Sequence, residues 1–91
     1  MKYEVKFTNQ FKKDLKLAKK QGKDIERLYA VIEKLADDEP LEQKYRDHDL
    51  NGNYKGCREC HVEPDWLLVY EVMDDVLVLM LYRVGSHSTL F

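Results

Sequence analysis

The sequence has few of the residues that crosslink, anchor or export a protein. Its two cysteines, Cys57 and Cys60, are too few for the disulfide framework of a small secreted domain. The longest apolar run, residues 76–82, has seven residues and cannot span a bilayer. The opening MKYEVKFT resembles a strand and lacks the apolar core of a signal peptide. We therefore expect a reducing, cytoplasmic location and no membrane partner.

Neither sign of charge dominates the whole chain. The net charge is −2, which argues against simple nonspecific binding to nucleic acid. Residues 1–34 nevertheless hold ten Lys or Arg and five Asp or Glu, whereas residues 35–91 hold five and twelve. The basic half can attract phosphates. The simpler interpretation is that its lysines only solvate exposed helix faces.

The length of 91 residues suits one compact domain and is too short for two, so we predict a single domain over residues 1–91. Alternation over residues 2–7 predicts a short strand. Helical spacing predicts one helix ending near Gln21 and a second over about residues 24–37. Residues 40–53 look irregular. Three further strands are predicted at about residues 54–62, 66–72 and 76–84.

Short links between these last strands favour antiparallel hairpins. The expected order is β-α-α-β-β-β. We therefore predict an α+β fold with a mostly antiparallel four-stranded sheet and two helices packed on one face.

The three histidines, His48, His61 and His87, all lie outside the predicted helices. Histidine titrates near neutrality and can both accept and donate protons at cellular pH. Taken singly, each is better interpreted as an ordinary surface or hydrogen-bonded residue.

The hairpins predict a more specific arrangement. If the 63–65 turn pairs His61 with Trp66, and the 73–75 turn pairs Trp66 with Arg83, these three side chains form a row on one face. His87 follows closely enough for the chain to turn back towards that row. A slip of one residue in register would destroy the row.

A cluster of histidine, arginine and carboxylate, without a phosphate-binding glycine loop, suits attack of an RNA 2′-hydroxyl on the adjacent phosphate. That reaction needs a base, an acid and positive charge near the phosphate, but no metal or cofactor. DNA lacks the nucleophile. Trp66 and Phe91 could stack on a splayed base, although core packing is the better interpretation of Trp66 alone.

The motif Cys57-x-x-Cys60-His61 matches the pattern for covalent c-type haem attachment. We reject a haem because such proteins are exported and because residues three apart on a strand point to opposite faces. The same geometry argues against a zinc site or a redox dithiol at these cysteines. We expect them to pack within the strand instead.

Three segments resemble the YafQ branch of the RelE/ParE toxin superfamily, and the likeness extends over essentially the whole chain. They are Tyr45–Leu50 with Gly52 and Lys55-Gly56, then Arg58–Tyr70, then Arg83–Phe91. The block H-x-E-P-D-W-x-L-x-Y and the ending G-S-H-S-x-L-F are fairly specific when they occur together.

The resemblance implies a RelE-like fold and a ribosome-dependent mRNA endonuclease that cuts the codon in the vacant A site. By matching position, the implied catalytic residues are His48, His61, Asp65 and His87, and the implied substrate contacts are Trp66, Arg83 and Phe91. Our role assignment takes His48 as general base and His87 as general acid, although these two could be exchanged. His61 and Asp65 would orient the substrate or stabilise charge. Alternatively, Asp65 is merely a turn residue.

The resemblance also implies a cognate antitoxin with a ribbon-helix-helix DNA-binding end, a heterotetrameric complex, and contact with operator DNA only through that antitoxin. The basic helices are candidates to contact ribosomal RNA and the antitoxin. Two alternatives remain open. One is the branch of the same fold that acts on gyrase without a nuclease site, and the other is a catalytically silent binding module.

Overall fold

The computed structural model describes residues 1–91 and contains one mixed sheet with helices on both sides. The strands are β1 (Glu4–Phe7), β2 (His48–Asp49), β3 (Arg58–Glu63), β4 (Trp66–Met73) and β5 (Val78–Gly85). The α-helices are α1 (Asn9–Lys20), α2 (Ile25–Ala36) and α3 (His87–Leu90), and two 3-10 turns are η1 (Gln43–Tyr45) and η2 (Gly52–Tyr54).

Local sequence signals fix the ends of the two long helices. The Thr8 hydroxyl accepts a hydrogen bond from the Phe11 N–H at 3.0 Å, and the Asp24 carboxylate accepts one from the Arg27 N–H at 3.1 Å. Both are N-caps that satisfy amide groups of the first helical turn. Gly22 takes a φ of +72° just after α1, where a side chain would be strained.

The strand order across the sheet is β1-β5-β4-β3-β2. β1 pairs in parallel with β5, and every other pair is antiparallel. The predicted α+β class is confirmed, and the predicted elements occur in the expected order, but the sheet has five strands where four were predicted. Two elements were not predicted: the two-residue strand β2, within the stretch expected to be irregular, and the short helix α3 in the tail.

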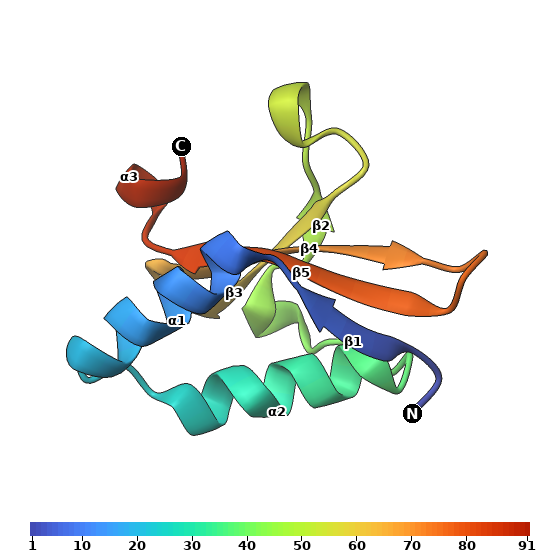
Figure 1. The fold of residues 1–91 in the computed structure, drawn as a ribbon, viewed down its shortest axis with the longest axis horizontal. Coiled ribbons are helices and arrows are strands. Elements are labelled where there is room, and N and C mark those ends of the chain that lie inside the picture. The colour runs from blue at the N-terminus through green and yellow to red at the C-terminus, as the bar shows by residue number, and fades with distance from the viewer.

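The two faces of the sheet differ in what covers them (Figure 1). α1 and α2 cover one face, the helix face, and enclose a core of fifteen buried residues that includes Leu28, Trp66 and Tyr70. The opposite face, which we call the open face, carries only a small buried cluster of Leu67, Val69 and Leu90. Since Leu90 belongs to α3, the C-terminal segment folds back over this open face.

The predicted row of His61, Trp66 and Arg83 is wrong. Glu63 pairs with Trp66 across a two-residue turn, and His61 pairs with Leu67 after an irregularity that accommodates Val62. Arg83 pairs with Val69, again beside an irregularity in register. Each irregularity inserts one residue and changes which side chains share a face. Trp66 consequently enters the helix-face core, while His61 lies on the open face beside Leu67.

No helix combines the length and the apolar character needed to cross a membrane.

Candidate active site

The sheet register places candidate residues in a row across the open face. His48 on β2 pairs with Glu59 on β3, Glu59 pairs with Val69 on β4, and Val69 pairs with Arg83 on β5. Paired residues on adjacent strands project their side chains to the same face. The row therefore carries a histidine and a glutamate on one side and an arginine on the other, with an apolar floor between them.

His48, Glu59 and His61 form a compact group, which we call the histidine–glutamate group. The two imidazole rings lie 6.2 Å apart between centroids. Nε2 of His48 lies 3.6 Å, and Nε2 of His61 3.5 Å, from the same carboxylate oxygen of Glu59. The Glu59 side chain is only 4% exposed, whereas that of His48 is 49% exposed. One buried carboxylate thus serves two imidazoles, of which His48 is open to a substrate.

Backbone carbonyls determine how both rings are oriented. His48 Nδ1 lies 2.6 Å from the Arg46 carbonyl oxygen, and His61 Nδ1 lies 3.2 Å from that of Pro64. A carbonyl oxygen can only accept, so each ring donates from Nδ1. Nε2 is therefore the nitrogen that each ring has available for proton transfer.

A second set of contacts holds the segment that carries His48. The Tyr70 hydroxyl donates to Asp47, and Arg58 donates from Nε to Asp47 at 3.3 Å. Arg58 also donates from Nη1 to Asp49 at 2.7 Å. Burial and then the bond to Asp47 raise the pKa of Tyr70 well above its usual value, so the phenol remains a donor. Asp47 and Asp49, the two chain neighbours of His48, are therefore hydrogen-bonded to side chains of β3 and β4.

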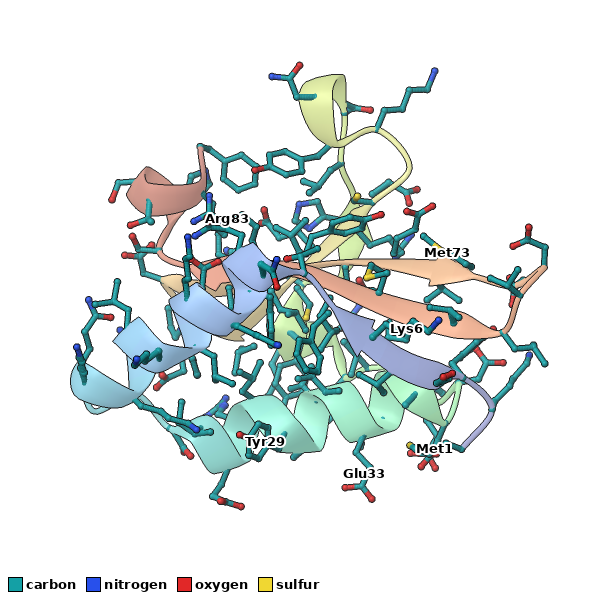
Figure 2. All side chains as sticks on the ribbon, in the orientation of Figure 1. Met1, Lys6, Tyr29, Glu33, Met73 and Arg83 are labelled. Carbon is teal, nitrogen blue, oxygen red and sulfur yellow. The ribbon has the colours of Figure 1, made fainter.

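Arg83 is oriented by Asp14, a residue of α1. The guanidinium donates from Nε to Asp14 Oδ2 and from Nη2 to Oδ1, both at 3.0 Å. Asp14 also accepts the Val84 N–H at 3.2 Å and the Gln10 amide at 3.0 Å. Burial favours the neutral acid, but the bonds from Arg83, Gln10 and Val84 outweigh it and lower the pKa of Asp14. Figure 2 shows Arg83 beside α1, on the sheet.

The chain's last residues form a separate group on the open face, which we call the C-terminal group. His87 lies 5.2 Å from Phe91 between ring centroids, and Phe91 meets Tyr54 edge-on at 5.5 Å. The Asp65 carboxylate accepts the backbone N–H of His87 at 3.1 Å, and the Ser86 hydroxyl accepts that of Thr89. These bonds fix where α3 begins and hence where His87 stands.

The structure brings together some of the predicted site residues but not all. His48 and His61 are neighbours, while His87 and Phe91 belong to the C-terminal group. Asp65 contacts the backbone of His87, not its ring. Trp66 is 2% exposed and presents no ring face to a base in this conformation, so the predicted stacking role is not supported. It does help to line a hollow of about 200 Å³ with Asp14, Gly85 and Thr89.

Two residues of the site, Asp14 and Glu59, were not predicted, although the sequence pattern around each could have indicated it. Asp14 is the one acidic residue of a basic helix, and it shares the apolar face with Phe11 and Ala18. A carboxylate at such a position needs a partner. Glu59 precedes His61 by two residues on a strand, so both point to the same face.

No group of three or more histidine, cysteine or acidic side chains is placed to hold a metal ion. Cys60 is fully buried and Cys57 is half-buried, and both thiols are free. Cys60 thus packs within a strand, as expected for both cysteines, whereas Cys57 precedes β3 and packs beside the small cluster on the open face.

Comparisons with known proteins connect this geometry to a family. A family model described as a bacterial toxin of type II toxin-antitoxin system, YafQ, matches residues 3–91. The mRNA interferase toxin YafQ of Escherichia coli strain K12 is 40% identical over 89 residues, which are 97% of this chain and 95% of that protein.

Solved structures agree with this match. The crystal structure of a metal-bound toxin from Helicobacter pylori superposes with a TM-score of 0.93 at 46% identity, covering 98% of this chain and 99% of that one. YafQ in the crystal structure of the E. coli DinJ-YafQ complex gives a TM-score of 0.90 at 40% identity, covering 98% of each chain.

The matches define a class of protein, the toxins of bacterial type II toxin–antitoxin systems. Within that class, this chain belongs to the YafQ family.

Proposed function

We propose that this chain is an endoribonuclease that cleaves mRNA in the ribosomal A site and so inhibits translation. Its curated relatives are named mRNA interferases at 40% identity over nearly the full chain. The observation that carries the proposal is the histidine–glutamate group, which sets two oriented imidazoles beside one buried carboxylate on the open face.

In the proposed reaction, His48 accepts the proton of the RNA 2′-hydroxyl through Nε2, and the 2′-oxygen attacks the adjacent phosphorus. The 5′-oxygen leaves as His87 donates a proton to it, which gives a 2′,3′-cyclic phosphate and a new 5′-hydroxyl. Each proton transfer of this kind typically accelerates the reaction by about 10²–10⁴-fold. Glu59 acts as a positioning residue, because its carboxylate lies 3.6 Å from Nε2 of His48 and 3.5 Å from Nε2 of His61 and pairs with either ring once that nitrogen carries a proton.

The remaining site residues position the phosphate and the base. Arg83 offers positive charge to the phosphate while Asp14 fixes the direction of its guanidinium. His61 and Asp65 orient the substrate, and Asp65 does so by placing His87. Phe91 is exposed and can stack on a base, whereas Trp66 shapes the site from the core side.

The proposal includes an antitoxin partner, since a YafQ relative has been solved in complex with DinJ. A ribbon-helix-helix antitoxin, a heterotetrameric complex and contact with operator DNA only through that antitoxin complete this part of the proposal. The enzyme acts in the cytoplasm as a single domain and uses no metal.

The experiment compares His87→Ala with the parent chain on mRNA engaged by purified ribosomes. An exposed control, Asp75→Asn in the β4–β5 turn, should cleave like the parent. His87→Ala should lose cleavage by at least about 10²-fold while keeping its melting temperature. Undiminished cleavage by His87→Ala contradicts the assignment of the acid.

Substrate chemistry tests the reaction independently of any variant. The upstream fragment should end in a 2′,3′-cyclic phosphate, and an mRNA with one 2′-deoxy nucleotide at the cut position should resist. Cleavage should require ribosomes and should survive chelation under conditions that keep the ribosomes assembled. Cleavage of the 2′-deoxy substrate would exclude the 2′-hydroxyl as nucleophile.

A further inference from the structure

The chain has four arginines, and the structure divides them into two pairs. Arg58 and Arg83 bind aspartates through their guanidinium groups. Arg27 and Arg46 form no ion pair. Arg27 belongs to α2, and Arg46 is the residue that follows η1. Both line one hollow of about 360 Å³. A guanidinium without a carboxylate is available to bind a phosphate from another molecule.

The lining of this hollow is mostly basic. Lys44 and His61 join the two arginines, and Val62, Glu63 and Pro64 complete it. Glu63 is the one acidic lining residue, while Glu42 lies 3.7 Å from the Lys44 ammonium without lining the hollow. The two unpaired arginines therefore leave the hollow with a net positive charge. Its volume falls at the lower end of the range for ligand sites, about 300–1,000 Å³.

An aromatic ring holds two of the cations in position. The Arg27 guanidinium carbon lies 5.8 Å, and the Lys44 ammonium 5.3 Å, from the centre of the Tyr45 ring. Such cation–π contacts restrict long side chains that would otherwise sample many rotamers. Tyr45 itself packs against the main core. The basic side chains are thus partly ordered before any ligand arrives.

The hollow adjoins the histidine–glutamate group through two residues. His61 lines the hollow and also lies 3.5 Å from Glu59. Arg46 lines it too, and the Arg46 carbonyl oxygen accepts the His48 Nδ1–H at 2.6 Å. Arg46 has a φ of +49°, a backbone conformation that non-glycine residues seldom adopt and that often marks functional sites.

We propose that this hollow binds a backbone phosphate of the RNA strand, one belonging to a nucleotide that flanks the cleaved bond. This proposal rests on the proposed function for the position of the cleaved bond, but phosphate binding by the hollow is testable without cleavage. RNA carries a phosphate at every nucleotide, so a strand held at His48 and His61 necessarily presents another phosphate beside them. Arg27 and Arg46 would fix the strand's direction without reading its sequence.

The test is a double variant, Arg27→Gln with Arg46→Gln, in the full chain. Binding of a short fluorescent single-stranded RNA, 2′-O-methylated to prevent cleavage, is followed by anisotropy between about 50 and 200 mM salt. The variant should bind several-fold more weakly, and the slope of log affinity against log salt should fall by about 0.7 to 1 for one lost phosphate contact. Arg27→Lys with Arg46→Lys should retain the salt slope.

A charge-matched control removes two exposed lysines of α1, Lys16→Gln with Lys20→Gln. This control should leave the RNA salt slope closer to that of the parent than the arginine variant does. Equal slopes for the arginine variant and the parent, or no RNA binding by the parent, would overturn the proposal. A polyglutamate peptide tests an acidic protein segment as occupant: weakened peptide binding with unchanged RNA binding would likewise overturn it.

Cleavage assays separate this proposal from the proposed function. If the enzyme is active, the arginine variant should raise KM more than it lowers kcat, since the hollow holds the strand in both ground and transition states. If the arginine variant binds RNA more weakly and the parent shows no cleavage, phosphate binding by the hollow is supported and the proposed nuclease activity is contradicted. Cleavage that His87→Ala abolishes, with unchanged RNA binding by the arginine variant, contradicts only the hollow.

Discussion

Replacing Asp14 with asparagine tests how the site is supported from the helix face. Asp14 accepts two bonds from Arg83 and one each from Gln10 and the Val84 N–H. Asparagine keeps the shape but replaces one acceptor by an NH₂ donor, so at least one of these donors loses its partner. The negative charge opposite Arg83 is lost as well.

The expected destabilisation follows from the burial of the two partners. Hydrogen bonds to charged groups contribute about 1.5–3 kcal/mol each in net terms. Breaking a fully buried ion pair costs about 3–5 kcal/mol. The Arg83 side chain is 24% exposed and can recover contact with water, so we expect about 2 kcal/mol in total for Asp14→Asn. For a domain of this size, that lowers the melting temperature by about 8–16 °C.

The pH dependence supplies a sharper test, because the pKa of Asp14 is lower in the folded state than its ordinary value of about 3.9. The unfolded chain therefore takes up this proton first as the pH falls. The stabilisation is complete well above pH 4 and is lost as the pH falls through the folded-state pKa. Thermal melts of parent and variant should differ most near neutrality and converge in acid.

Asp75→Asn, which removes an exposed carboxylate, is the control and should melt like the parent at every pH. A gap between the parent and Asp14→Asn that stays constant down to pH 2.5 would refute the role of the carboxylate charge. Equal melting temperatures at pH 7 would refute the whole argument. If Arg83 contacts the phosphate, Asp14→Asn should also lower kcat at a temperature where both chains are folded.

Other perturbations test the remaining parts of the structure. Trp66→Ala should destabilise by about 3–5 kcal/mol in a denaturant titration because it empties the core, whereas Phe91→Ala should change stability little. Tyr70→Phe should cost about 1–2 kcal/mol and speed amide exchange in the loop of Asp47, and unchanged exchange would contradict its role as a tether. Burial, and then the charges of nearby acids, raise the pKa of the Cys60 thiol well above its usual value. Alkylation of Cys60 at pH 8 should therefore require unfolding, and rapid labelling of the native protein would contradict this.

The sequence predicted those elements whose signals are local. The helix spacing around Leu28 and Leu35 and the alternation along the strands each depend on neighbours a few residues away. The strand β2 was not predicted because a strand of two residues is too short to show an alternating pattern. The helix α3 escaped because four residues are stabilised mainly by contacts with β5 and with Asp65.

Register was the step at which prediction from sequence failed. Alternation shows that His61 and Trp66 are strand residues, but an inserted residue on β3 and another on β5 change their partners. The position of such an insertion depends on how a strand pairs with its neighbour, so the alternation within one strand does not locate it. The sequence therefore identified candidate chemical groups but misplaced their neighbours.

What the sequence determined by itself was the inventory: three histidines outside the two long helices, a tail resembling that of a toxin family, and an α+β order. Only the tertiary structure decided that His48 and His61 share the carboxylate of Glu59, and that Asp14 directs Arg83 from the opposite layer. The contact of His48 with Glu59 and the pairing of Asp14 with Arg83 join residues that meet through sheet register or are far apart in the chain. No local pattern encodes them, because they arise from the register between strands and from the packing of a helix against the sheet.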